Sequence, residues 1–124
     1  MSTNPFIVVY ADDEADVRDT VAEMLRAAGL VVHACCDGVE AIRTCGEVSA
    51  NALLLDLNMP GMDGFAVARE IRSKPVTARL RIVALTGRST WDMRIRALDA
   101  GFDEFMVKPI GLEHLVAVPR GNTR

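Results

Sequence analysis

The sequence predicts an α/β domain in which a five-stranded parallel sheet carries helices on both faces. Short apolar runs alternate five times with amphipathic segments, and glycine or proline follows several of these segments. Some of the runs are apolar at every position, as in strands that are buried on both sides of a parallel sheet. Five βα units in series build such a sheet. With 124 residues, half of them hydrophobic, the chain is large enough for one core and too short for two.

The first half of the chain contains two βα units and the strand of a third. We expect a strand at residues 6–10 and a helix at 14–28, because apolar residues there recur on one face: Val17, Val21, Met24, Leu25 and Ala28. Gly29 stands where a helix C-cap belongs. A second strand is expected at 31–34, before a short helix marked by Val39, Ile42 and Cys45. Residues 52–55 are fully apolar and predict a central third strand.

The second half completes the alternation. A helix at 64–73 directs Phe65, Ala68 and Ile71 inward and ends before a proline. The remaining segments are a strand at 82–85, a helix at 90–100 closed by a glycine, a strand at 104–107 and a helix at 112–118 that Pro119 ends early. We therefore expect one domain at 1–118, a short polar tail at 119–124 and no effector domain in this chain.

Composition excludes several classes of function. Fourteen basic and seventeen acidic residues give a net charge of −3, and the basic residues are scattered. This argues against direct nucleic-acid binding through bulk charge. The apolar runs are far shorter than the ~20 residues that span a membrane, and residues 1–4 lack the basic region of a secretory signal. We expect a cytoplasmic protein that makes no membrane contact.

The cysteines and histidines carry no recognisable site. Cys35 and Cys36 are adjacent and Cys45 stands alone, without metal-ligand spacing. We expect buried or half-buried thiols, as in a reducing compartment. His33 falls in the second strand and His114 in the last helix, and we expect both to be structural.

Trp91 begins the fourth predicted helix and allows two interpretations. Its spacing to Ile95 and Leu98 is i, i+4, i+7, which favours packing against the domain. A solvent-facing tryptophan would instead suit contact with a partner. We favour packing.

Polar residues follow the predicted strands at the points where the strands end. These residues are Asp12, Asp13 and Glu14, then Asp56, then Thr86, and finally Lys108; Gly87 and Pro109 directly follow the last two. Parallel strands bring their carboxyl ends to one edge of the sheet, where sites of this architecture lie. Clustered carboxylates suit Mg²⁺, and a lysine with a threonine hydroxyl can hold phosphoryl oxygens. One carboxylate can then act as a nucleophile on phosphorus.

Four segments of the chain resemble the receiver domain of bacterial two-component response regulators. They are Ala11-Asp12-Asp13-Glu14, the run from Leu55 to Gly64 (LDLNMPGMDG), Leu85-Thr86-Gly87 and Val107-Lys108-Pro109. The resemblance covers residues 6–118. It implies the flavodoxin-like (βα)₅ fold with strand order 2-1-3-4-5.

The resemblance also implies a role for each matching residue. Asp56 would be the phosphoacceptor, and Mg²⁺ would be bound by Asp13, Asp56 and the backbone carbonyl of Asn58, with Asp12 acting through water. Lys108 would pair with the phosphoryl group, directed by a cis peptide bond before Pro109. Thr86 and Phe105 would be the switch residues, Gly87 would give access to a backbone N–H, and the phosphoryl lifetime would be tuned by Asn58 and Arg88.

The partners follow from the same resemblance. A histidine kinase or a histidine phosphotransfer protein would supply the phosphoryl group. A downstream protein would bind the face formed by the fourth helix, fifth strand and fifth helix, and the domain would be a monomer or a weak dimer. Two alternatives stay open: a docking receiver that works without phosphorylation, and a receiver cut from a hybrid kinase or larger regulator. An aspartate-dependent phosphatase is disfavoured, because the position two residues after Asp56 is Asn58 and cannot act as a general acid.

Overall fold

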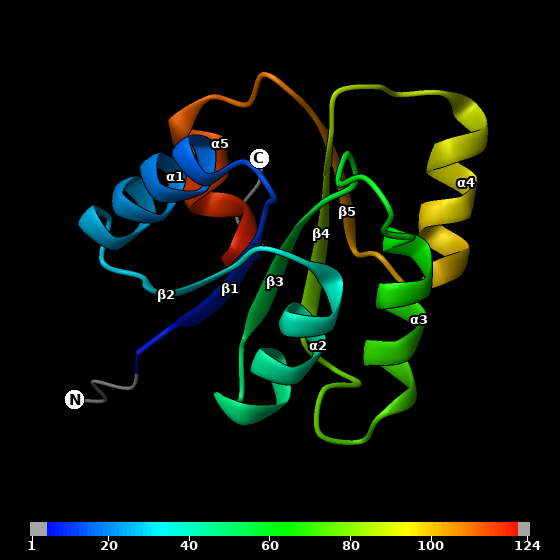
Figure 1. Cartoon of the computed structure of the whole chain (residues 1–124), viewed down its shortest axis with the longest axis horizontal. Coiled ribbons are helices and arrows are strands. Elements are labelled where there is room, and N and C mark those ends of the chain that lie inside the picture. The colour runs from blue at the N-terminus through cyan, green and yellow to red at the C-terminus, as the bar shows by residue number, and fades with distance from the viewer. Residues whose placement is uncertain (1–4, 122–124) are drawn as a thin grey trace.

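The computed structural model describes residues 5–121 and has five parallel strands with helices on both sides (Figure 1). The strands are β1 (Ile7–Ala11), β2 (Val31–Cys35), β3 (Ala52–Asp56), β4 (Arg81–Thr86) and β5 (Glu104–Val107). The helices are α1 (Ala15–Ala27), α2 (Gly38–Glu47), α3 (Gly64–Ser73), α4 (Trp91–Ala100) and α5 (Leu112–Ala117). The strand order β2-β1-β3-β4-β5 confirms the expected fold. Residues 1–4, where we expected no secretory signal, and residues 122–124 of the expected tail lie outside the described part.

The apolar content of each strand matches its place in the sheet. All five residues of β3, the central strand, are buried. β1 and β4 flank it and are buried along nearly their whole length. The edge strand β2 is buried only at Val32 and Cys35, and its first residue Val31 is 40% exposed. The run at 52–55 thus correctly predicted the centre of the sheet.

Side chains alternate along the strands and fill two cores on opposite faces of the sheet. Helices α2, α3 and α4 cover one core, and α1 and α5 cover the other (Figure 1). The predicted inward residues of α3 all belong to the first core: Phe65, Ala68 and Ile71. Tyr10, Leu54 and Val83 lie in the second core, under α1 and α5.

Local signals in the sequence start and end most of the helices. Side chains of Asp37, Asp63 and Thr90 accept hydrogen bonds from the first turns of α2, α3 and α4. Gly29 and Gly101 follow α1 and α4 with φ of 96° and 105°. This left-handed conformation favours glycine and ends a helix cleanly, as expected at both positions.

The inward faces of α1 and α2 differ in part from the predicted ones. Ala22 and Leu25 are buried in α1, whereas Val17 is 38% exposed. In α2, Ala41 is buried and Val39 is 75% exposed. The short alanine side chains let each helix lie close to the sheet, while Leu25 and Cys45 are buried as predicted.

The cysteines and histidines fall in different environments. Cys35 and Cys45 are buried in the core as expected, and burial raises the pKa of the Cys45 thiol to about 12. Cys36 is exposed, so the expectation of a buried or half-buried thiol is wrong there. Cys36 directly follows β2, where the chain leaves the sheet for the α2 cap. His33 is half-buried in β2 and His114 is exposed on α5.

Arg72 of α3 ties together three segments of the chain. Its Nε and Nη2 atoms donate to the carbonyl of Gly101 at 3.0 and 2.7 Å, and Nη2 also pairs with Asp103 Oδ2 at 2.7 Å. Nη1 donates to the carbonyls of Ala78, at 3.0 Å, and Leu80. The guanidinium therefore joins the end of α3, the loop before β4 and the end of α4.

Packing continues past residue 118, the last residue of the predicted domain. Val118 and Pro119 are buried in a 3₁₀ turn, η1 (Val118–Arg120), and Arg81 Nε donates to the Val118 carbonyl at 2.7 Å. The helix α5 ends at Ala117, one residue before the predicted end, and Pro119 lies in the turn that follows. Within residues 5–121, the helices are all too short or too polar to span a bilayer.

Candidate functional site

The ends of β1 and β3 bring two buried carboxylates to the same edge of the sheet. The register pairs Ala11 with Leu55, so Asp12 and Asp56 follow at matching positions on neighbouring strands. Asp12 is 1% exposed and Asp56 is 3% exposed. Buried carboxylates need partners for their oxygens, and these partners define the site.

Asp12 is held by two donors from its own segment. The Tyr10 hydroxyl donates to Asp12 Oδ2 at 2.6 Å, and the Glu14 backbone N–H donates to Oδ1 at 3.0 Å. Arg18 Nη1 donates to the Asp12 carbonyl at 2.9 Å and fixes the start of α1 over the site. Burial, followed by the hydrogen bond to Asp12, raises the pKa of the Tyr10 phenol far above its usual range. The phenol therefore remains a donor at neutral pH.

Asp56 is paired with the lysine that follows β5. Lys108 Nζ lies 2.7 Å from Asp56 Oδ2, and the Asn58 backbone N–H donates to Oδ1 at 2.8 Å. The Lys108 side chain is 35% exposed against 5% for that of Asp56, so the ammonium reaches a buried carboxylate from the surface. The peptide bond between Lys108 and Pro109 is cis. The structure thus brings together the carboxylate and ammonium that the sequence placed at the ends of different strands.

The end of β4 supplies the other polar groups of this edge. Thr86 is buried, and its Oγ1 accepts a hydrogen bond from the Arg88 backbone N–H at 3.2 Å. The backbone N–H of Gly87 donates to Asn58 Oδ1 at 2.9 Å. The Lys108 backbone N–H donates to the Thr86 carbonyl at 2.7 Å, which fixes the lysine relative to β4. The side chain of Arg88 is exposed.

The donors at this edge fit a magnesium ion. Mg²⁺ is commonly bound by one or two carboxylates while it keeps several waters. Each carboxylate oxygen of Asp12 and Asp56 accepts one of the bonds above, which leaves it a further lone pair. Asp13 follows and is exposed. Within residues 5–121, three or more His, Cys, Asp or Glu side chains are nowhere gathered as a metal site, and the ligand set of Asp12, Asp13, Asp56 and Asn58 stays a prediction.

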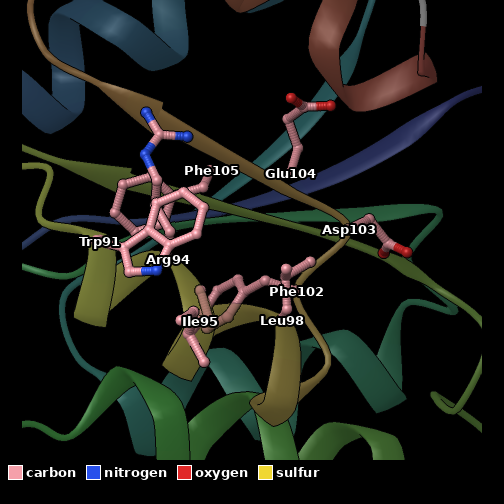
Figure 2. Close-up of a pocket in the computed structure, with 9 residues that line it drawn as sticks. Trp91, Arg94, Ile95, Leu98, Phe102, Asp103, Glu104 and Phe105 are labelled. Atoms are coloured by element: carbon pink, nitrogen blue, oxygen red, sulfur yellow. The ribbon is translucent and has the colours of Figure 1, made fainter.

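Phe105 lies on β5 beside α4 and is half-buried against the core. The guanidinium of Arg94 lies 5.0 Å from the centroid of its ring. Both residues line a pocket of about 380 Å³ between α4 and β5 (Figure 2). This contact between a cation and an aromatic face connects α4 to the strand that carries the predicted switch residue.

Trp91 does not pack as predicted. It is 79% exposed, and the two residues that share its helical face, Ile95 and Leu98, are 50% and 71% exposed. Figure 2 shows these side chains of α4 around the same pocket as Phe105. The side of α4 that faces the core instead contains Ala97 and Ala100, which are buried. These small side chains let α4 lie against its neighbours. A tryptophan that faces solvent is the arrangement expected of a partner contact.

The role of Tyr10 has a signal in the sequence that the strand pattern hides. Tyr10 falls in an apolar run that predicts an ordinary buried strand. Residues two apart in a strand point to the same face, so a tyrosine two positions before Asp12 can reach that carboxylate. The only tyrosine of the chain therefore belongs to the site.

The fold and this edge of the sheet define the class of the protein. Residues 8–120 match the family model of the response regulator receiver domain. The chain belongs to this family, the receiver domains of two-component signalling systems, and the resemblance seen in the sequence is confirmed.

Several known proteins are similar to this chain. It is 37% identical over 115 residues to the transcriptional regulatory protein PrrA of Mycobacterium tuberculosis, with 93% of the chain and 48% of the relative covered. The chain spans about half the length of the curated relatives it matches. The Vibrio cholerae chemotaxis protein CheY4 is 26% identical with a TM-score of 0.89, over 94% of this chain and 98% of that one. The receiver domain of the Pseudomonas aeruginosa sensor histidine kinase PA1611, solved with magnesium coordinated in its active site cleft, is 27% identical with a TM-score of 0.84, over 94% and 96%.

Proposed function

We propose that this domain accepts a phosphoryl group on Asp56 from a phosphohistidine of a kinase or phosphotransfer protein. A carboxylate oxygen of Asp56 attacks phosphorus, a P–O bond forms, the P–N bond breaks, and the leaving imidazole takes up a proton. The observation that carries the proposal is the 2.7 Å contact between Lys108 Nζ and the buried Asp56. This contact supports the proposal because a cation beside Asp56 would neutralise the charge of a phosphoryl group there.

The other residues at this edge have separate tasks in the proposal. Asp12, Asp13, Asp56 and the Asn58 carbonyl would hold Mg²⁺, which neutralises phosphoryl oxygens when it is bound. Lys108 would transfer its contact from Asp56 to the new phosphoryl group. Thr86 would donate its hydroxyl to the same group, and the Gly87 N–H would exchange its bond to Asn58 for one to a phosphoryl oxygen.

The output of the proposed switch is a change at the surface of α4, β5 and α5. A displacement of Thr86 alters the β4–α4 segment, and Phe105 is held on the neighbouring strand by Arg94. The exposed apolar face of α4 supports this surface as the site for a downstream protein. The coupling between the two sites would be ~1–3 kcal/mol, as is typical of allosteric proteins. Asn58 and Arg88 would set the lifetime of the phosphoryl group. A cytoplasmic location and a monomer or weak dimer complete the proposal.

Intact-protein mass spectrometry after incubation with acetyl phosphate tests this function. The wild type should gain one phosphoryl group only when Mg²⁺ is present. Asp56→Asn should gain none, while the control Asp19→Asn, which changes an exposed aspartate of α1, should behave as the wild type. An adduct of equal yield on Asp56→Asn would refute the assignment. A wild type that binds Mg²⁺ and forms no adduct at any time point would support the docking receiver instead.

A further inference from the structure

Tyr10 is the only tyrosine of the chain and lies in the buried part of β1. It is 1% exposed, and its neighbours Val8, Val9 and Ala11 are completely buried. A hydroxyl in such a place is unfavourable unless it is hydrogen-bonded. Its partner is Asp12 Oδ2, at the short distance of 2.6 Å. The phenol is thus committed to the carboxylate at the end of its own strand.

The two donors on Asp12 fix the plane of its carboxylate group. Tyr10 holds Oδ2 and the Glu14 backbone N–H holds Oδ1. With both oxygens bonded to rigid elements, the group cannot rotate without the loss of a buried hydrogen bond. Each oxygen keeps a lone pair on its other side.

The chemistry of the two donors distinguishes Asp12 from Asp56. The donor to Asp56 Oδ2 is the Lys108 ammonium, which neutralises the carboxylate as it binds. The donors to Asp12 are a phenol and a peptide N–H, and both are neutral. Asp12 is therefore oriented by two neutral donors, and neither of them adds a positive charge at this carboxylate. An oriented and charged oxygen donor is what a hard divalent cation requires.

We propose that Tyr10 is a positioning residue for a divalent cation, and that it acts by holding Asp12 in the orientation in which this carboxylate contributes to Mg²⁺ binding. This inference rests on the proposed function, since it concerns the same edge of the sheet. Groups that hydrogen-bond a metal ligand commonly change metal affinity by ~10–100-fold when they are removed. Tyr10→Phe deletes the hydroxyl and keeps the ring that fills the core.

Calorimetric titration with MgCl₂ tests the proposal on the complete chain. The dissociation constant of Tyr10→Phe should be about tenfold higher than that of the wild type. The matched control is Thr77→Val, because Thr77 is also buried and its hydroxyl donates to the Ile71 carbonyl at 2.7 Å, in the segment before β4. The control loses a buried hydroxyl bond at the opposite edge of the sheet, so its affinity for Mg²⁺ should stay within twofold of the wild type.

A spectroscopic measurement needs no variant. Wild-type protein labelled with ¹³C at the tyrosine ζ carbon has a single resonance, because the chain has a single tyrosine. Saturation with MgCl₂ should shift this resonance, with the same dissociation constant as the calorimetry, since the phenol is bonded to the carboxylate that the cation approaches.

The outcomes separate the two proposals. A wild type that fails to bind Mg²⁺ overturns both the metal-dependent function and the role of Tyr10. If the wild type binds Mg²⁺ and its tyrosine resonance does not change, only the role of Tyr10 is overturned. The same holds if Tyr10→Phe binds Mg²⁺ with the affinity of the wild type. An equal loss of affinity in Tyr10→Phe and Thr77→Val would show an effect of stability and would also overturn it.

Discussion

The contact between Asp56 and Lys108 predicts a measurable coupling between the two side chains in the free domain. We consider the substitutions Asp56→Asn and Lys108→Met, alone and together. At the observed 2.7 Å and an effective dielectric constant of about 20, the attraction between unit charges is about 6 kcal/mol. The Lys108 side chain is 35% exposed, and the burial of Asp56 carries a desolvation cost. Screening and desolvation reduce the expected coupling to about 2 kcal/mol.

The four proteins should follow a definite pattern in urea unfolding. Lys108→Met should lower the free energy of unfolding by about 2 kcal/mol, because it leaves the buried Asp56 without its cation. The same substitution should cost under about 0.5 kcal/mol in the Asp56→Asn background. EDTA in the buffer keeps metal ions from replacing the ammonium. If Lys108→Met has the same cost in both backgrounds, the 2.7 Å contact does not stabilise the fold and the reasoning fails.

Three further predictions concern the scaffold. Arg72→Met should lower the free energy of unfolding by about 3 kcal/mol, because three backbone carbonyls and the Asp103 carboxylate lose a charged donor. Arg43→Met, which removes an exposed partner of two surface ion pairs, should cost under about 0.5 kcal/mol; equal losses would contradict the role of Arg72. Burial raises the pKa of Cys45 from 9.0 to about 12. The contribution of this thiol to the free energy of unfolding is therefore fully present below pH 9 and falls above it, because the thiol then ionises in the unfolded chain. The fall from pH 8 to pH 10 should be about 1.3 kcal/mol, and urea titrations of Cys45→Ala should show a fall smaller by that amount. Gly101→Ala should destabilise by about 1–2 kcal/mol, because its φ is 105° and a Cβ would press on the Arg72 side chain. Gly46→Ala, in an open position inside α2, should stabilise by up to about 1 kcal/mol, and melting curves that show the same sign for both glycines would refute this reading.

The fold was predictable because its strong signals are local and repeated. The fully apolar run at 52–55 needs burial on both faces, which a strand between two layers of helices provides. This run is the central strand of the sheet. The polar residues at the strand ends were recognisable because a parallel sheet brings such residues to one edge. Asp56 ends one apolar run and Lys108 directly follows another, although the two residues are 52 positions apart in the sequence.

The failures arose where a periodic pattern leaves a choice of face. Trp91 and Ala97 occupy different sides of a ten-residue helix, and both sides contain apolar residues. The larger side chains suggested the buried side, but the small alanines allow closer packing. Val39 was misplaced for the same reason. Tyr10 was overlooked because its apolar ring satisfies the strand pattern, while its hydroxyl depends on a partner that only the folded edge defines.

The bonds of Arg72 tie the C-terminal end of α4 to other segments of the chain, whereas the hydrogen bonds at its N-terminal end are local and exposed. The helix is anchored beside Gly101, whereas its first turn is held by a side chain of the preceding loop, Thr90. Ten residues make a rod of about 15 Å, so a tilt of about 10° around the anchored end moves the opposite end by roughly 2.6 Å. Trp91 lies at that opposite end and is the only indole of the chain. If α4 tilts around the end held by Arg72, Trp91 moves farther than the rest of the helix. The fluorescence of Trp91 would therefore report the tilt.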